Sequence, residues 1–221
     1  MPGWHTLDWA KPVPCRRGLT PPYTASVLAS LARPLIATQR LLLLAAHPSH
    51  AAAATAFHLR NRARFARWDP PVGDDFFTES HQTERLRLAA LAFFEGSAFR
   101  YWLCEPGAPQ RILGTVHFSQ VTRGAFHSAT LGYALDAEFE GRGLMAEALR
   151  AGIAEMFSPR VNLHRVQAGH RPENLRSAAT LARLGFEPEG LAREYLYIDG
   201  AWRDHVITAL RNPDFAPPTG W

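Results

Sequence analysis

Apolar residues recur along this chain with two different periods, which predict helices in some segments and strands in others. In residues 143–157, Met145, Leu149, Ile153 and Met156 form one stripe at the spacing of an amphipathic helix. Short apolar or alternating runs between turn residues predict strands. On these grounds we expect helices at about 48–59, 83–95, 143–157 and 173–184, and strands at about 40–45, 99–103, 112–118, 130–135, 161–168, 193–198 and 202–210.

Glycine and proline mark several of the expected element ends. Gly96 and Gly185 directly follow two predicted helices, as C-terminal caps do, and Pro159 stops a third. Asp199-Gly200 lies between the last two strands and is a strong hairpin signal. This order of elements predicts a mixed α/β (α+β) fold in a single domain.

The domain limits follow from a change in composition. Residues 1–33 hold five prolines and predict an extended or mobile arm, although Trp4 and Trp9 favour some docking onto the domain. We expect the folded domain over residues 34–212 and a C-terminal tail over residues 213–221. The chain has 221 residues, of which 47% are apolar, enough for a sizeable core.

The net charge of +4 comes almost wholly from arginine, because Lys11 is the only lysine. This usage either reflects nucleotide composition or suits an acidic or ribosomal partner. No dense run of basic residues appears, so we expect no sequence-specific nucleic-acid binding. The most apolar stretch, residues 41–57, is too short and too interrupted to span a bilayer, so no membrane association is expected.

Cysteine and histidine usage argues against a disulfide framework and against a metal centre. Cys15 and Cys104 form no paired motif, which fits a reducing cytoplasm. His164 and His170 can share one strand face, but two histidines make no zinc site without further ligands. We therefore expect a cytoplasmic protein without a metal ion.

The segment Glu140-Gly141-Arg142-Gly143-Leu144-Met145 stands between a predicted strand and a predicted helix. Glycines there let the backbone N–H groups turn inward, and a helix N-terminus adds unpaired donors and a partial positive charge. The order strand, glycine turn and helix start therefore indicates an anion site. A plain turn is the alternative reading of the same glycines.

Asn174 and Ser177 are three residues apart at the start of a predicted helix. At that spacing both side chains can face one cleft. Helix capping is the alternative, since both residue types favour helix starts.

Several segments together resemble one family, the GNAT-fold N-acetyltransferases, and within it the ribosomal-protein-alanine N-acetyltransferases of the RimJ/RimL type, closer to RimJ. The resemblance covers roughly residues 36–211. The segments that carry it are Gly96-Ser97-Ala98-Phe99, residues 113–119, Leu131-Gly132-Tyr133, Gly141-Arg142-Gly143-Leu144-Met145, Asn174-Leu175-Arg176-Ser177, residues 181–186 and residues 195–206.

The resemblance implies a twisted, mixed but mostly antiparallel sheet flanked by helices, with acetyl-CoA in a cleft between splayed central strands. It implies that backbone N–H groups of the glycine segment wrap the pyrophosphate of CoA. It further implies that the strand end at Leu135 and Asp136 holds the pantetheine arm and the acetyl carbonyl, and that Asn174 contacts the pantetheine. The implied cofactor residues are Leu135, Asp136, Glu140, Gly141, Arg142, Gly143, Leu144, Met145 and Asn174.

Glu140 departs from the family pattern, which has Gln or Arg at that position. A carboxylate beside a pyrophosphate repels it unless the side chain turns away. We expect weaker CoA binding, with Arg142 as the neighbouring compensating charge.

The resemblance also implies the catalytic residues. Glu194, next to Tyr195-Leu196, is the expected base, and the alternative is a surface strand carboxylate. Ser177 is the expected acid or hydrogen-bonding partner of the departing thiolate. Further candidates are Tyr133, Tyr195, His117 and His205, whereas Phe118 and Trp202 are expected in the core.

The function that these expectations favour is transfer of an acetyl group to the N-terminal α-amino group of a protein, in particular a ribosomal protein that starts with Ala or Ser. Association with the ribosome is compatible with this reading. Two alternatives stay open: acetylation of a small amine such as a polyamine, an amino acid or an aminoglycoside, and a non-catalytic role in ribosome assembly. Loops at residues 68–80 and 123–128 are expected to set the acceptor.

Overall fold

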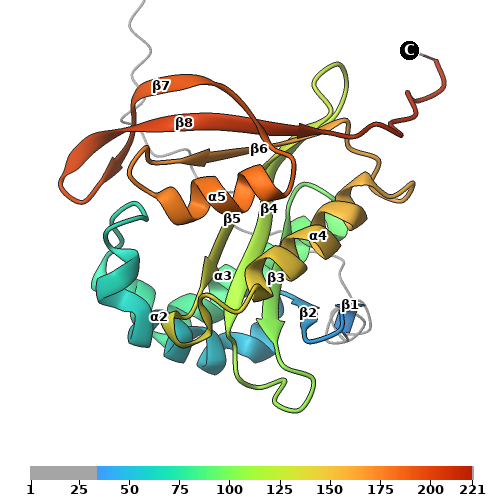
Figure 1. The fold of residues 1–221 in the computed structure, drawn as a ribbon. Helices are drawn as coiled ribbons and strands as arrows, with labels where there is room; N and C mark the ends of the chain where they lie inside the picture. Colours follow the sequence, from blue (N-terminus) through green and yellow to red (C-terminus); the bar gives the residue numbers. More distant parts are fainter. Residues whose placement is uncertain (1–33, 221) are drawn as a thin grey trace, which may run out of the picture.

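Eight strands form one twisted sheet in the computed structural model, which describes residues 34–220 (Figure 1). The strands are β1 Pro34–Ala37, β2 Leu42–Ala45, β3 Phe99–Cys104, β4 Gly114–Thr122, β5 Ser128–Leu135, β6 Arg165–His170, β7 Glu187–Ile198 and β8 Ala201–Arg211. The helices are α2 Ala51–Phe65, α3 Glu79–Glu95, α4 Leu144–Phe157 and α5 Leu175–Arg183, with short 3-10 turns η1 Pro48–His50, η2 Asp74–Phe77 and η3 Ala137–Phe139.

The strand order is β1-β2-β3-β4-β5-β6-β8-β7, and only β5 and β6 run parallel among these neighbours. The pairing of β5 with β6 covers residues 128–131 and ends where Leu131 meets Ala168. Residues 132–135 of β5 continue beside β4 alone, while β6 goes on beside β8. The two central strands therefore splay apart and leave a wedge beside residues 132–135, as the family resemblance implied.

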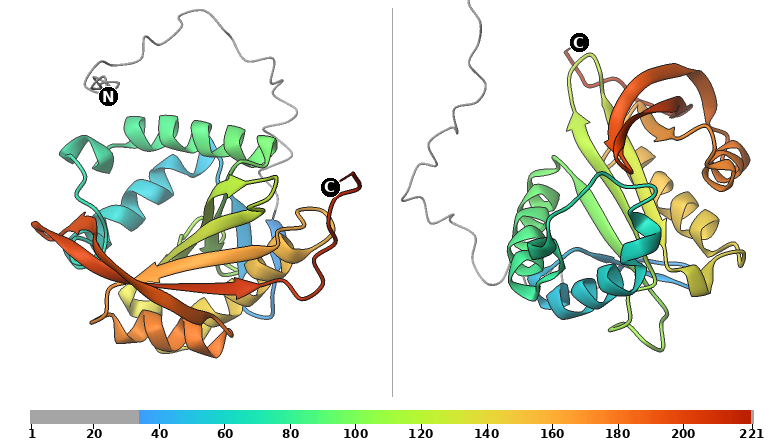
Figure 2. Two further views of the ribbon diagram at one scale, coloured as in Figure 1. Left: turned by 90° about the horizontal axis from the view of Figure 1, so that it is seen from above. Right: turned by 90° about the vertical axis from the view of Figure 1, so that its left-hand side faces the viewer.

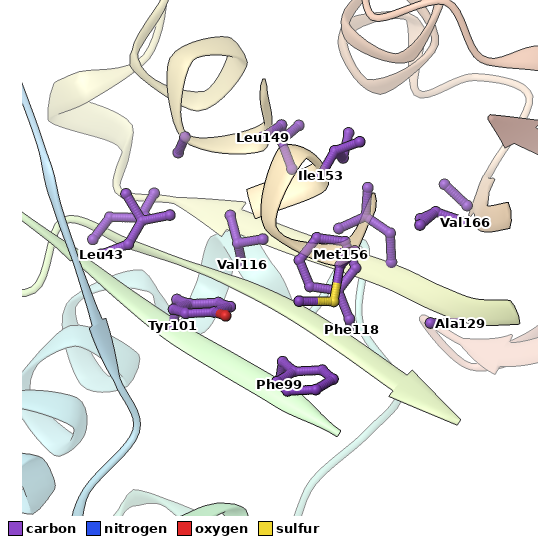
Figure 3. Close-up of a cluster of buried hydrophobic side chains, with 14 of the residues drawn as sticks. Leu43, Phe99, Tyr101, Val116, Phe118, Ala129, Leu149, Ile153, Met156 and Val166 are labelled. Atoms are coloured by element: carbon purple, nitrogen blue, oxygen red, sulfur yellow. The ribbon is translucent and has the colours of Figure 1, made fainter. Parts of the chain in front are cut away.

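Helices cover both faces of the sheet, with α2 and α3 on one face and α4 and α5 on the other (Figure 2). Because successive side chains of a strand point to opposite faces, each strand contributes apolar residues to a core on either side of the sheet. Val116 and Phe118 of β4 face α4, where a Cβ on Gly152 would lie 3.2 Å from the Phe118 ring. This close approach lets Leu149 and Met156 bury fully against the sheet (Figure 3).

The opposite face carries a second core beneath α2 and α3. Trp102 of β3 is fully buried there, and its ring lies 6.1 Å from that of Phe57, edge to face. Leu86 and Cys104 belong to the same cluster. Burial of such large side chains stabilises each by about 1.5–3 kcal/mol, so the sheet is held from both faces.

Most predicted elements are present, and the hairpin signal is confirmed, since Asp199 and Gly200 both have positive φ. Strand β6 begins at Arg165 instead of residue 161, because Asn162 donates its backbone N–H to Ser158 in a turn after α4. The apolar residues that suggested a strand there, Val161 and Leu163, are buried from a loop.

The ends of the first two helices also differ from the prediction. Helix α2 continues to Phe65, since its Ala and Arg residues are good helix formers. Helix α3 begins at Glu79, where the Thr78 hydroxyl accepts the N–H of His81 as an N-cap. Strand β1 was not predicted from the sequence.

Phe118 is fully buried, as expected, but the expectation for Trp202 was wrong. Trp202 is 61% exposed on β8 and contacts Tyr197 edge to face at 5.9 Å across the hairpin. The expected arm of residues 1–33 lies outside the described residues, and the domain limits stay a prediction. Among residues 34–220 no helix is long and apolar enough to cross a membrane.

Candidate active site

The glycine segment between η3 and α4 forms an open loop. Gly141 and Gly143 have φ of 75° and 74°, a conformation that other residues rarely adopt. A Cβ on Gly141 would meet nothing within 4 Å. Helix α4 begins at Leu144 without a side-chain cap, and the backbone N–H groups of residues 141–146 donate to no acceptor within residues 34–220. The loop thus offers several N–H donors at a helix N-terminus, which suits an anion.

Arg40 holds the start of α4 in place. Its guanidinium pairs with Glu147 at 2.6 Å and donates to the carbonyl of Arg142 at 2.9 Å. The Thr38 hydroxyl donates to Glu147 at 2.6 Å. Burial acts to raise the pKa of Glu147, but the hydrogen bonds from Thr38 and Arg40 hold it below its usual value. Arg40 therefore also places a positive charge beside the glycine loop.

The carboxylate of Glu140 is neutralised by two arginines from different helices. Arg64 of α2 donates to one oxygen at 2.6 Å, and Arg176 of α5 donates to the other. Arg142 forms no ion pair with Glu140 among residues 34–220, since its guanidinium lies over the Phe139 ring, 5.3 Å from the centroid, and its compensating role stays a prediction. Glu140 therefore adds less negative charge to the loop than its residue type suggests.

Tyr133 and Ser177 meet in the wedge between β5 and β6. The Tyr133 hydroxyl lies 2.7 Å from the Ser177 hydroxyl, and Ser177 is buried at the start of α5. Burial raises the pKa of Tyr133, although the bond to Ser177 acts in the other direction, so the phenol stays protonated at neutral pH. Asn174 caps α5 by accepting the N–H of Ser177 at 3.1 Å. The capping reading of Asn174 thus holds, and its side chain stands at the same wedge.

The end of β5 is fixed by polar contacts. The backbone N–H of Asp136 donates to Leu113 at 2.7 Å, and its buried carboxylate accepts from Arg60. Burial acts to raise the pKa of Asp136, but the bonds from Arg60 hold it below its usual value. Arg64 donates to the carbonyl of Leu135. The cofactor roles of Leu135 and Asp136 stay predictions.

Glu194 lies on an exposed bulge of β7. Its φ is 48°, and the pairing with β8 shifts register between Ala192 and Leu196. Its backbone N–H donates to the Asp204 carboxylate at 2.8 Å. Within residues 34–220 its own carboxylate accepts no hydrogen bond, and the structure does not bring it into contact with Ser177. Its role as a base stays a prediction.

The remaining catalytic candidates, His205, Tyr195 and His117, lie outside the contact between Tyr133 and Ser177. His205 is buried on β8, with its ring 5.5 Å from that of exposed Tyr195. His117 lies on the sheet face beneath α2 and α3, away from Ser177. Burial and the nearby Arg100 and Arg85 lower the pKa of His117 to about 3, so its ring is neutral.

Sequence reasoning missed the arginines that hold this site, namely Arg40, Arg60, Arg64 and Arg176. Nothing distinguishes them in a chain where arginine supplies almost every positive charge. Within residues 34–220 no group of three or more His, Cys, Asp and Glu side chains could hold a metal ion.

Comparison with known proteins agrees with this geometry. The chain matches the family model described as an acetyltransferase (GNAT) domain over residues 40–187. It is 40% identical over 182 residues to the [ribosomal protein uS5]-alanine N-acetyltransferase of Escherichia coli (strain K12), which covers 82% of this chain and 93% of that protein.

Solved structures give the same result. The ribosomal-protein-S5-alanine acetyltransferase from Vibrio fischeri matches with a TM-score of 0.79 at 36% identity, over 82% of this chain and 98% of that chain. Mycobacterium smegmatis RimJ, solved in complex with CoA-disulfide, matches with a TM-score of 0.72 at 31% identity, over 77% of this chain and 81% of that chain. The resemblance to the RimJ/RimL type is confirmed. With its fold, its glycine loop and these relatives, the chain belongs to the GNAT acetyltransferase family.

Proposed function

We propose that the protein transfers the acetyl group of acetyl-CoA to the N-terminal α-amino group of a protein, with a ribosomal protein that starts with Ala or Ser as the first acceptor to test. The observation that carries this proposal is the open glycine loop beside a wedge that holds the Tyr133–Ser177 hydroxyl pair. The relative from Escherichia coli, named for the alanine of ribosomal protein uS5, supports the acceptor class. A cytoplasmic location and contact with the ribosome follow from the same proposal.

The described residues fit acetyl-CoA. The N–H groups of residues 141–146, which have no acceptor among residues 34–220, and the Arg40 charge suit a pyrophosphate. The wedge gives a pantetheine arm a path from this loop to the hydroxyl pair, past Leu135, Asp136 and Asn174. When bound, acetyl-CoA supplies the acetyl group as a reactive thioester.

The proposed acceptor needs only modest help from a base. A peptide α-amino group has a pKa of about 8, so a sizeable minority is neutral at pH 7, whereas a lysine amine has a pKa of about 10.4. Glu194, directly or through a water molecule, accepts the proton that the amine loses on forming the amide bond. Its exposed carboxylate has no hydrogen-bond partner among residues 34–220, which suits proton exchange with solvent.

The Tyr133–Ser177 pair serves the other half of the reaction. As the new C–N bond forms, the C–S bond breaks and the sulfur needs a proton or a hydrogen bond. A hydroxyl of the pair donates to that sulfur, and the protonated phenol of Tyr133 supports it. A polyamine acceptor is disfavoured, because Arg85 and Arg100 lie at the sheet face beneath α2 and α3 and the nearby Asp69 offsets their positive charge only in part.

The direct test is release of free thiol from acetyl-CoA with short peptides that start with Ala, Ser or Met. We expect turnover with the Ala and Ser peptides and none with spermidine, the control amine. Turnover with spermidine alone would favour the small-amine alternative. Binding of CoA without any turnover would favour the non-catalytic one.

Replacement of Glu194 by Gln should lower kcat about 10²- to 10⁴-fold, the usual contribution of a positioned base. The matched control is Glu187→Gln, which removes another exposed carboxylate of β7. It should leave kcat unchanged. A fall of less than threefold in Glu194→Gln at saturating substrate would assign proton removal to another group.

Loss of either hydroxyl of the Tyr133–Ser177 pair should slow turnover about 10- to 100-fold, the worth of a hydrogen bond to a charged group. Tyr133→Phe and Ser177→Ala each break the same 2.7 Å contact, so the double variant should be little slower than the slower single variant. Rate losses that multiply in the double variant, or single variants with full activity, would contradict this role. Titration with CoA checks that each variant still binds the cofactor.

Replacement of Glu140 by Gln should strengthen CoA binding about fivefold, because it releases Arg64 and Arg176 from an ion pair worth about 1 kcal/mol. The effect should shrink as salt is added. Glu138→Gln, which removes a carboxylate paired with Arg111, is the control. An unchanged Kd for CoA in Glu140→Gln would mean that the carboxylate does not weaken the site.

A further inference from the structure

A row of three residues crosses the sheet on the face beneath α2 and α3. Arg100 of β3 pairs in register with His117 of β4, and His117 pairs with Gly132 of β5. Residues opposite one another in paired strands point to the same face. Any Cβ on Gly132 would overlap the His117 ring, so glycine leaves the space that the ring occupies.

Arg100 brings a positive charge to this face of the sheet. Within residues 34–220 its guanidinium makes no hydrogen bond or ion pair, whereas its backbone carbonyl accepts the N–H of Ala46. Burial, together with repulsion from Arg85, lowers the pKa of Arg100 to about 9, so the group is still charged at neutral pH. A half-buried guanidinium without an acceptor is costly, and an arriving anion would offset that cost.

Arg85 of α3 brings a second positive charge to the same place. It donates to Gln82 at 3.0 Å and lies over the Phe76 ring, 5.1 Å from the centroid. Asp69 is the nearby acid, and burial raises the pKa of its carboxyl to about 6, against the pull of Arg64 and Arg85. It forms no ion pair with either arginine within the described residues, so it compensates the two charges only in part.

The two histidines beside these arginines are neutral. Burial and the same arginines lower the pKa of His58 and of His117 to about 3. The Nδ1 atom of His117 is buried without a hydrogen-bond partner among the described residues. The cluster of Arg85, Arg100, His58 and His117, which we name the arginine pocket, therefore has a net positive charge and unused polar atoms.

The arginine pocket lies next to the wedge in the strand register. Gly132 is the first residue of β5 beyond its pairing with β6, and the adjacent Tyr133 points to the opposite face, toward Ser177. The hydroxyl pair and the arginine pocket thus lie on the two sides of one gap in the sheet. An acceptor polypeptide that brings its amine to the thioester from the side of α2 and α3 therefore passes the arginine pocket.

We propose that the arginine pocket binds a carboxylate of the acceptor, an Asp or Glu side chain within the first few residues after the reacting amine, with Arg100 as its main partner and Arg85 as the second. This inference rests on the proposed function. The planar guanidinium matches a carboxylate with two parallel hydrogen bonds, which a neutral amide side chain cannot reproduce. Specificity then comes from Arg100, whose charge nothing else in the described chain satisfies.

The test compares acceptor peptides that start with Ala, end in an amide, and differ only by Glu or Gln at position 2, 3 or 4. At one of these positions the wild-type protein should prefer Glu in kcat/KM by about tenfold or more, as expected for a charged hydrogen bond. In Arg100→Gln the ratio should fall to about one, and Arg100→Lys should restore part of it. Because the ratio is taken within each variant, a general loss of activity does not change it.

Arg87→Gln is the control, since Arg87 lies on the exposed side of α3 and pairs with Glu84. Its ratio should equal that of the wild-type protein. If Arg100→Gln does not fold, Arg85→Gln provides the second variant, with a smaller fall expected. A wild-type ratio of one at every position, or a ratio unchanged by both substitutions, overturns the inference while the proposed function stands.

Free amino acids as acceptors distinguish binding of an α-carboxylate from binding of a side-chain carboxylate. Turnover of free alanine that depends on Arg100, without turnover of any amidated peptide, would assign the pocket to an α-carboxylate and overturn both the peptide acceptor and the side-chain inference. Absence of turnover with every acceptor would overturn both as well.

Discussion

The divergence of β5 from β6 after Leu131 is the constraint on which the rest of the site depends. A strand that loses its neighbour inside a sheet leaves backbone groups that need other partners. Arg64 satisfies one of them at Leu135, and the hydroxyls of Tyr133 and Ser177 occupy the gap itself. The sheet tolerates the opening because α4 and α2 hold it from opposite faces. The site therefore lies where the pairing of β5 and β6 ends, and the cores on the two faces of the sheet stabilise this opening.

Arginine side chains are the second feature that shapes the site. Arg40, Arg60, Arg64 and Arg176 come from three different segments, because Arg60 and Arg64 both lie on α2. Each fixes a part of the wedge or of the glycine loop through a carboxylate or a carbonyl. Such pairs would contribute little on an open surface, but they converge here on one half-buried cleft, where screening is weaker. The same charges make the cleft attractive to anions. One set of side chains thus shapes the site and sets the sign of its potential.

Sequence patterns predicted the parts of the fold that rest on local geometry. The glycines at 141 and 143, the stripe of α4 and the Asp199-Gly200 turn all need backbone or periodicity that few residues provide. Sequence patterns failed where contacts between residues distant in the chain determine the structure. Val161 and Leu163 are buried although they lie in a loop, and Trp202 is exposed on a hairpin that extends from the sheet. The ion pairs of Glu140 could not be predicted either, because Arg64 and Arg176 lie 76 and 36 residues away.

The charges of the arginine pocket also affect which amine can react. A positive amine that approaches Arg85 and Arg100 is repelled, whereas its neutral form is not, so the arginine pocket favours loss of the proton. An α-amino group, whose pKa of about 8 lies close to neutral pH, needs only a small shift, but a lysine side chain would need several times more free energy. A carboxylate a few residues along the acceptor would be attracted by the same arginines. If the proposed function and the role of the arginine pocket hold, selection of a neutral α-amine and attraction of a nearby acid both follow from one arrangement of charge.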